Sequence, residues 1–163
     1  MLISSHFPRA LETAEIIAPS LTRPGEARLV PVVDDGFGEH DPGPDCDGMS
    51  FDDFVERYSM SPWQSDPYGV TFPGGETLAA FHYRIGAALH RTMEVHEGRT
   101  IVLSCHGGVI DAVLRLVLKA PATGLFDLWT LNTAVAEVVR VEVNRWRLVR
   151  YGDVAHLAAT VAG

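Results

Sequence analysis

The segment Thr100-Ile-Val-Leu-Ser-Cys-His-Gly-Gly-Val-Ile-Asp-Ala-Val-Leu-Arg-Leu-Val-Leu118 carries the signals that decide the fold. Its apolar, β-branched start at 101–103 predicts a short strand that is buried on both faces. Gly107 and Gly108 interrupt the extended pattern, and apolar residues then recur at helical spacing. The segment therefore predicts a strand, a tight turn and a helix that begins just past His106.

The junction between this strand and this helix predicts an anion site. A helix N-terminus presents free N–H groups and the positive end of the helix dipole, here from Gly107 onward. His106 is a candidate to donate a proton or a charge-assisted hydrogen bond to a phosphate; the alternative is that it only caps the turn. Cys105 suggests thiolate chemistry, but Asp111 stands where a phosphate-binding arginine would be needed. We therefore interpret Cys105 as a small buried residue.

Length and composition indicate one globular domain that spans 1–163. The chain has 163 residues, 47% of them hydrophobic, and a net charge of −8 without a basic stripe, which argues against a nucleic-acid partner. No apolar run approaches the roughly 20 residues that cross a membrane, and no secretory signal is visible. Cys46 and Cys105 form neither a disulfide framework nor a zinc pattern, so we expect a cytoplasmic protein.

Arg9 is a second candidate for binding an anion. Met1–Ser4 predicts the end of a strand, and residues 5–18 predict a helix with Pro8 in its first turn. A cation in that turn opposes the helix dipole, which favours an acid there. We interpret Arg9 as holding an anion together with the first-turn N–H groups; the alternative is a solvated surface arginine.

Residues 34–48 follow a predicted strand at 27–33 and predict a long acidic loop, and long ordered loops are often functional. Asp34 or Asp35, at the end of the strand, is a candidate general acid. A calcium loop is a weak alternative because the later ligands are missing. Most acids of the loop are expected to be solvated.

The rest of the chain alternates helices and strands. Ser50 predicts the N-cap of a short helix, and a longer helix is expected from Leu78 to about His96, in which Arg84 faces either solvent or the acidic loop. Its expected core face is Ala80, Phe81, Ile85, Ala88, Leu89 and Met93. Aromatic residues at 61–70 are expected to pack on the core, and strands at 134–143 and 146–151 are expected to form a hairpin through Asn144–Arg145. This order predicts an α/β fold, a three-layer α/β/α sandwich with the hairpin at an edge of the sheet.

Four segments resemble, in order, motifs of the histidine phosphatase superfamily, also called phosphoglycerate mutase-like. Ser4–Ala14 is similar to S-S-P-x-x-R-A-x-x-T-A with His6 in place of the proline, Asp34–Glu39 to E-x-x-F-G-E, Pro73–Thr77 to P-G-G-E-S, and Leu103–Ile110 to V-S-H-G-G-V-I. The resemblance covers Met1 to about Leu157. It implies a phosphoglycerate mutase-like fold and phosphoryl transfer through a phosphohistidine, with no metal and no cofactor. It also implies that Arg9 and His106 grip the phosphate and that Asp34 protonates the leaving oxygen.

The sequence departs from the family in one respect. The nucleophilic histidine of the family lies in an R-H-G motif at the end of the first strand, and this sequence contains no R-H-G. We therefore expect a domain truncated at the N-terminus, with two inner sheet edges unpaired. Three explanations stay open: a longer protein, a natural remnant, or another histidine in the nucleophile's place, for which His6 is the candidate.

The function predicted is hydrolysis of a small-molecule phosphate ester by a phosphomonoesterase, with hydrolysis favoured over mutase action. The alternative is a non-catalytic phosphate-binding or interaction domain, because the nucleophile motif is absent. No membrane partner is expected, and the unpaired sheet edges make a homodimer worth testing. The central expectation is that Arg9 and His106 face the same anion.

Overall fold

The computed structural model describes residues 1–59, 74–122 and 128–158. The chain divides into two compact units, Met1–His106 and Gly107–Gly163. The aromatic segment predicted at 61–70 lies outside the described residues. That the whole chain forms a single domain stays a prediction.

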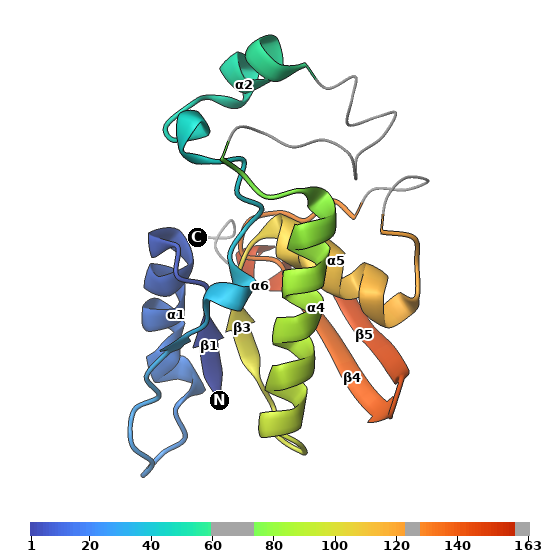
Figure 1. The fold of residues 1–163 in the computed structure, drawn as a ribbon. Helices are drawn as coiled ribbons and strands as arrows, with labels where there is room; N and C mark the ends of the chain where they lie inside the picture. Colours follow the sequence, from blue (N-terminus) through green and yellow to red (C-terminus); the bar gives the residue numbers. More distant parts are fainter. Residues whose placement is uncertain (60–73, 123–127, 159–163) are drawn as a thin grey trace. The chain divides into compact units, whose positions relative to one another are not determined.

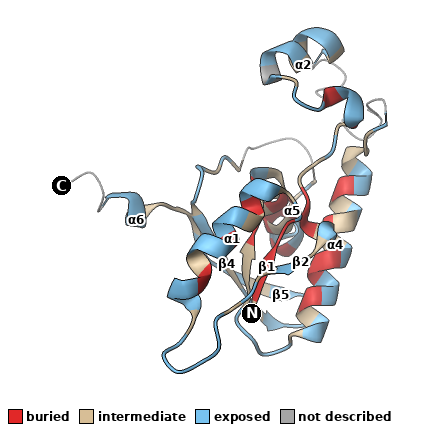
Figure 2. Ribbon diagram, turned by 90° about the vertical axis from the view of Figure 1, so that its left-hand side faces the viewer, coloured by how far each residue is buried: buried red, intermediate tan, exposed pale blue. Residues whose placement is uncertain are grey.

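A three-stranded parallel sheet organises the first unit, with β1 (Leu2–Ser4) between β2 (Val32–Val33) and β3 (Val102–Ser104). All three residues of β1 are buried, and Figure 2 shows this strand in red. The predicted strand at 27–33 is shorter than expected, because β1 pairs with it only at Val32 and Val33. Since all three strands run in parallel, their carboxyl ends meet at one edge of the sheet, where α/β folds place their ligands.

Helix α1 (Pro8–Leu21) lies along β1 and β3 (Figure 1). Proline occupies its first turn, as predicted, and Ala14 and Ala18 pack with Leu2 in the buried core. The helix runs beyond its predicted end and includes Pro19. Thr22 stabilises this last turn, since its N–H and its hydroxyl both donate to the Ala18 carbonyl, at 3.1 and 2.8 Å.

The acidic loop contains two short turns and leads to a capped helix. The turns are the 3-10 helices η1 (Asp35–Phe37) and η2 (Pro44–Cys46), and α2 (Phe51–Tyr58) follows them. The predicted cap is confirmed: Ser50 Oγ accepts the N–H of Asp53 at 3.1 Å.

Helix α4 (Leu78–Val95) is the long helix of the first unit, and Thr77 caps it. It packs on η1 and buries a face that agrees with the prediction in part: Ala80 is exposed, Met93 is half-buried and Thr92 is buried. The buried residues are Phe81, Ile85, Ala88, Leu89 and Thr92. The structure also resolves the alternative left open for Arg84, whose guanidinium faces the acidic loop.

The second unit begins with α5 (Gly107–Leu118), which starts directly after His106 as predicted. Strands β4 (Val135–Glu142) and β5 (Arg145–Asp153) form the predicted antiparallel hairpin, and α6 (Ala155–Ala158) follows. The hairpin turn lies one residue earlier than predicted, with Asn144 in the left-handed region at φ 61°.

The expectation of one sheet with the hairpin at its edge is not met in the described part of the chain, where no strand pairing joins β4–β5 to β2–β1–β3. In those residues β3 pairs only with β1, and β4 only with β5. The two unpaired inner sheet edges expected from the sequence stay a prediction. None of the described helices combines the length and apolar character that crossing a membrane requires.

Candidate functional site

Two predicted site residues, Asp34 and His106, lie with Ser5 at the carboxyl edge of the parallel sheet. Ser5 follows β1, Asp34 follows β2, and His106 lies two residues after β3. Backbone hydrogen bonds extend the sheet to these positions, since the N–H of Ser5 donates to the Ser104 carbonyl and the N–H of Asp34 to the Ser4 carbonyl, both at 2.9 Å. Their positions are therefore set by the sheet rather than by free loops.

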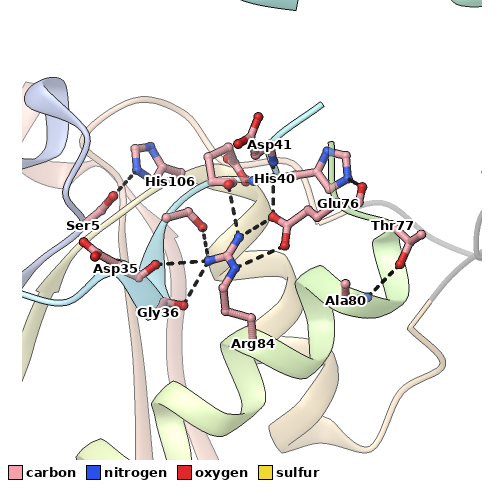
Figure 3. Close-up of polar contacts among 12 residues, drawn as sticks. Ser5, Asp35, Gly36, His40, Asp41, Glu76, Thr77, Ala80, Arg84 and His106 are labelled. Carbon is pink, nitrogen blue, oxygen red and sulfur yellow. Dashed lines mark hydrogen bonds and ion pairs between the residues drawn. The ribbon is translucent and has the colours of Figure 1, made fainter. Parts of the chain in front are cut away.

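His106 is buried, with 7% of its surface exposed. Its Nε2 atom is hydrogen-bonded to Ser5 Oγ at 2.8 Å (Figure 3). The same oxygen accepts the N–H of Phe7 at 3.2 Å. The fully buried Ser5 therefore fixes the orientation of the imidazole ring from the neighbouring strand.

Phe7 brings Arg9 and His106 together. The Cζ atom of Arg9 lies 4.8 Å from the centroid of the Phe7 ring. The His106 ring meets the same ring edge-on, with centroids 5.2 Å apart. Ser104 Oγ donates to the Ala10 carbonyl at 2.8 Å and so ties the first turn of α1 to the end of β3. The two residues predicted to grip a phosphate thus contact one aromatic ring; that they hold the phosphate stays a prediction.

The electrostatic setting of His106 favours its neutral form when no anion is bound. Burial lowers the pKa of His106 most, the positive charge of Arg9 lowers it further, and His6 adds a smaller effect in the same direction. The carboxylate of Glu39 opposes them. An anion bound beside Arg9 would offset these positive charges, so the site gains a proton more readily once it is occupied.

The thiol of Cys105 is unsuited to nucleophilic chemistry. Its burial raises the pKa of Cys105 to about 12, and the carboxylate of Glu39 acts in the same direction. The group is therefore protonated at neutral pH, whereas the thiolate is the reactive form. This agrees with the interpretation that Cys105 is not a thiolate nucleophile, but the residue is half-buried rather than buried.

Asp34 is engaged on the side of α4. Its two carboxylate oxygens accept hydrogen bonds from Nη2 of Arg91 at 2.9 and 2.8 Å, and Oδ1 also accepts the N–H of Gly36 at 2.9 Å. Among its contacts in the described residues, none is with Arg9 or His106. The structure thus does not join Asp34 to the other predicted site residues, and its role as proton donor stays a prediction.

Gly107 is the first residue of α5 and follows His106 directly in the chain. It belongs to the second unit, so its relation to Arg9 also stays a prediction. The described residues contain no cluster of three or more His, Cys, Asp or Glu side chains that could hold a metal ion.

Sequence reasoning missed the central position of Phe7. Phe7 is the N-cap of α1 and makes no side-chain cap hydrogen bond. An aromatic residue is unusual there, since polar residues that accept the first N–H groups are preferred. That mismatch, just before Pro8 and Arg9, was the available signal for a role other than capping.

Comparisons with known proteins bear on the whole chain. Residues 1–154 match the family model of the histidine phosphatase superfamily (branch 1). The chain is 30% identical over 160 residues to phosphoglycerate mutase-like protein 4 of Arabidopsis thaliana, which covers 96% of this chain and 66% of that protein. It is 25% identical over 159 residues to the metal-independent phosphoserine phosphatase of the same plant, with coverages of 96% and 62%.

Among solved structures, YhfR of Bacillus stearothermophilus superposes with a TM-score of 0.77 at 23% identity, over 96% of this chain and 75% of that one. This likeness shows a shared fold. The chain spans about two-thirds or less of the length of the two curated relatives named above, 66% and 62%.

Proposed function

The chain belongs to the histidine phosphatase superfamily (branch 1), and from this premise we propose that it acts as a phosphomonoester hydrolase on a small-molecule phosphate ester. The observation that carries the proposal is the arrangement of Arg9, Phe7 and His106 at the carboxyl edge of the parallel sheet. It places a guanidinium and an imidazole, from distant parts of the sequence, on one aromatic ring.

Phosphoryl transfer depends mainly on positioning and on stabilising charge, and this arrangement offers both. The planar guanidinium of Arg9 can donate to two phosphate oxygens at once. The dianion brings negative charge beside His106, so His106 takes up a proton and donates a charge-assisted hydrogen bond. Gly107, at the N-terminus of α5, is the proposed backbone donor to the same phosphate.

The proposal assigns the leaving-group proton to an acid at the same sheet edge. The resemblance implies Asp34 for this role. Since Arg91 occupies both of its carboxylate oxygens, Asp34 can serve only if Arg91 releases it.

The attacking histidine is not among the residues that match the family motifs, because the sequence contains no R-H-G. This observation favours the second candidate function, a non-catalytic phosphate-binding or interaction domain. The two candidates differ in turnover. A phosphate-binding domain and a hydrolase would both bind inorganic phosphate, but only the hydrolase would release the alcohol from a phosphate ester. Trapping the protein during turnover and mapping phosphohistidine by mass spectrometry would locate the nucleophile.

The test combines binding and hydrolysis. Calorimetry with inorganic phosphate and steady-state hydrolysis of an aryl phosphate are measured for the wild type, Arg9→Ala and His106→Ala. We expect each variant to bind phosphate about ten- to a hundred-fold more weakly, the cost of losing a hydrogen bond to a charged group, and to lose hydrolysis. Arg150→Lys is the matched control, since Arg150 forms its two ion pairs in the β4–β5 hairpin. Binding and hydrolysis unchanged in both site variants would overturn the proposal.

Phosphoserine is the first natural ester to test, because one relative is named a metal-independent phosphoserine phosphatase. Hydrolysis is proposed over mutase action, so inorganic phosphate is the expected product.

The cytoplasm remains the proposed location because Cys46 and Cys105 are both free thiols. A homodimer is proposed for testing because, among the described residues, β3 pairs only with β1 and β4 only with β5.

A further inference from the structure

His6 stands where the family motif has proline, and the structure places it beside the proposed phosphate site. It follows Ser5, whose hydroxyl is bonded to His106. Its ring stacks on Phe7 with centroids 4.5 Å apart and an interplanar angle of 27°. Its side chain is 45% exposed, so a ligand can reach it. His6 therefore shares the Phe7 ring with Arg9 and His106.

Asp35 pairs with one side of the His6 ring. Its Oδ1 atom lies 3.5 Å from Nδ1 of His6, and no described residue forms a hydrogen bond with Nε2. A carboxylate beside Nδ1 can orient an imidazole ring and leave Nε2 for a ligand, as in hydrolase triads. The Asp35 side chain is 85% exposed, however, and such an exposed pair holds a ring only weakly.

The backbone of the turn that follows Asp35 lies directly against the ring. A Cβ atom placed on Gly38 would lie 2.8 Å from Cε1 of His6, closer than any real contact. Gly38 has an ordinary φ of −61°, so alanine there would meet no conformational strain but would have to displace the His6 ring. The turn therefore borders the imidazole directly.

Arg84 fixes the turn from α4. Its guanidinium donates to four successive or nearly successive carbonyl oxygens: Asp35 at 3.4 Å, Gly36 at 3.2 Å, Gly38 at 3.0 Å and Glu39 at 3.3 Å. Its Nε and Nη2 atoms also donate to the carboxylate of Glu76, which neutralises its charge (Figure 3). The side chains of Arg84 and Glu76 are only 28% and 18% exposed, which makes this ion pair less screened than a surface pair.

We propose that His6 is an acid–base residue of the phosphate site, with Asp35 orienting its ring and Arg84 positioning the turn against it. The proposal rests on the proposed function. Protonated His6 donates the Nε2 proton to the bridging oxygen as the P–O bond breaks, so the leaving group departs as a neutral alcohol and His6 is left neutral. The phosphoryl group passes to the attacking nucleophile, a histidine imidazole or water, and the product alcohol carries the transferred proton away.

The surroundings of the two candidate acids favour His6 over Asp34. Nε2 of His6 has no hydrogen bond among the described residues, whereas both carboxylate oxygens of Asp34 accept from Arg91. The charged and titratable groups that share the site with His6 are Asp35 from the turn, Glu39 just after it, Arg9 from α1 and His106 after β3. The carboxylate of Asp35 lies beside Nδ1 of His6, and a bound phosphate would bring negative charge to the side of the site that Arg9 occupies.

The first test follows the histidine rings of the full chain, labelled with 15N at histidine, by nuclear magnetic resonance during a titration with inorganic phosphate. One phosphate oxygen then takes the place of the bridging oxygen. We expect the ring signals of His6 and His106 to shift together with one dissociation constant, while His90, an exposed histidine paired with Glu94 on α4, stays unchanged. Assignments come from His6→Asn and His106→Asn. A shift of His106 without His6 overturns the role of His6 alone; no shift of either overturns the proposed function as well.

The second test examines positioning. In Arg84→Lys the His6 shift on phosphate binding should shrink or vanish while the His106 shift persists, because lysine cannot reach four carbonyls at once. Gly38→Ala should act in the same way, because its Cβ atom would displace the His6 ring. It replaces Arg84→Lys as the test if that variant does not fold. Arg150→Lys, the matched control, should keep both shifts. An unchanged His6 response in both Arg84→Lys and Gly38→Ala overturns the positioning role.

A leaving-group comparison tests the proton transfer itself. A general acid matters most when the leaving oxygen is strongly basic, so His6→Asn should lower kcat for an alkyl phosphate by about a hundred-fold and kcat for an aryl phosphate far less. His106→Asn should lower both. Equal loss on the two esters in His6→Asn overturns the acid–base role.

Discussion

Ser5 and His106 are joined by a hydrogen bond of 2.8 Å between Oγ and Nε2, and both residues are buried. The bond links the residue after β1 to the residue that precedes α5. It therefore connects the motif at 4–14 with the motif at 103–110, which are the two motifs of the proposed phosphate site that lie farthest apart in the sequence. It also holds the imidazole ring in place before any phosphate arrives.

Ser5→Ala should lower the free energy of unfolding by about 1–3 kcal/mol, because it leaves a buried imidazole nitrogen without its partner. Phosphate binding should weaken as well, since the His106 ring loses its fixed orientation. Urea denaturation and phosphate calorimetry measure the two effects. Ser4→Ala is the matched control, because Ser4 is a buried serine whose hydroxyl donates to the Ser5 carbonyl instead. Equal losses of phosphate binding in the two variants would contradict a specific role for the Ser5–His106 bond.

The lowered pKa of His106 predicts a dependence of stability on pH. In the unfolded chain the histidine titrates near its ordinary value of about 6.5. The folded protein lowers the pKa of His106 through burial and the charge of Arg9, so the unfolded state binds more protons between the two values. Stability is therefore fully present above about pH 6.5 and falls as the pH drops through the folded pKa.

Urea denaturation at a series of pH values checks this sign. The wild type should lose more stability below about pH 6.5 than His106→Asn, which cannot take up the proton. His90→Asn should follow the wild type, because His90 is exposed on α4. A His106→Asn profile that runs parallel to the wild type would contradict the lowered pKa.

Local signals in the sequence predicted most of the elements around the site. The strand at the N-terminus, the helix after Pro8, the Ser50 cap and the helix that begins after His106 all follow from periodicity and end signals within a few residues. The interactions that stabilise these elements are largely local, so a single sequence is enough to predict them. The strand before Asp34 is shorter than predicted because its length depends on how far β1 extends beside it.

Local sequence signals could not predict the side-chain contacts that shape the site. Arg91 binds Asp34 and Arg84 binds the turn from a helix far along the chain, and the sequence alone left the direction of Arg84 open. Which of several arginines on a helix reaches a loop depends on tertiary packing. Phe7 became central for the same reason, because its contacts with Arg9 and His106 require α1 and β3 to lie side by side.

The thiol of Cys105 should be inert in the folded protein. Its pKa of about 12 leaves almost no thiolate at neutral pH, so alkylation by iodoacetamide should be slow until the protein unfolds. The measurement uses Cys46→Ala, so that only Cys105 reports, with mass spectrometry in the absence and presence of urea. Cys105→Ala should also keep phosphate binding. Fast alkylation of the native protein would contradict this prediction.

The last prediction concerns the Asp34–Arg91 ion pair, because substitutions there distinguish Asp34 from His6 as the general acid. If Asp34 only caps η1, Asp34→Asn should leave kcat for an alkyl phosphate nearly unchanged, since asparagine still accepts the N–H of Gly36. It should also cost no more than about 1 kcal/mol of stability, because Arg91 is exposed and its ion pair is screened. Arg91→Gln, which frees the carboxylate, should likewise leave kcat unchanged. A large loss of kcat in Asp34→Asn together with a gain in Arg91→Gln would instead identify Asp34 as the acid that Arg91 restrains.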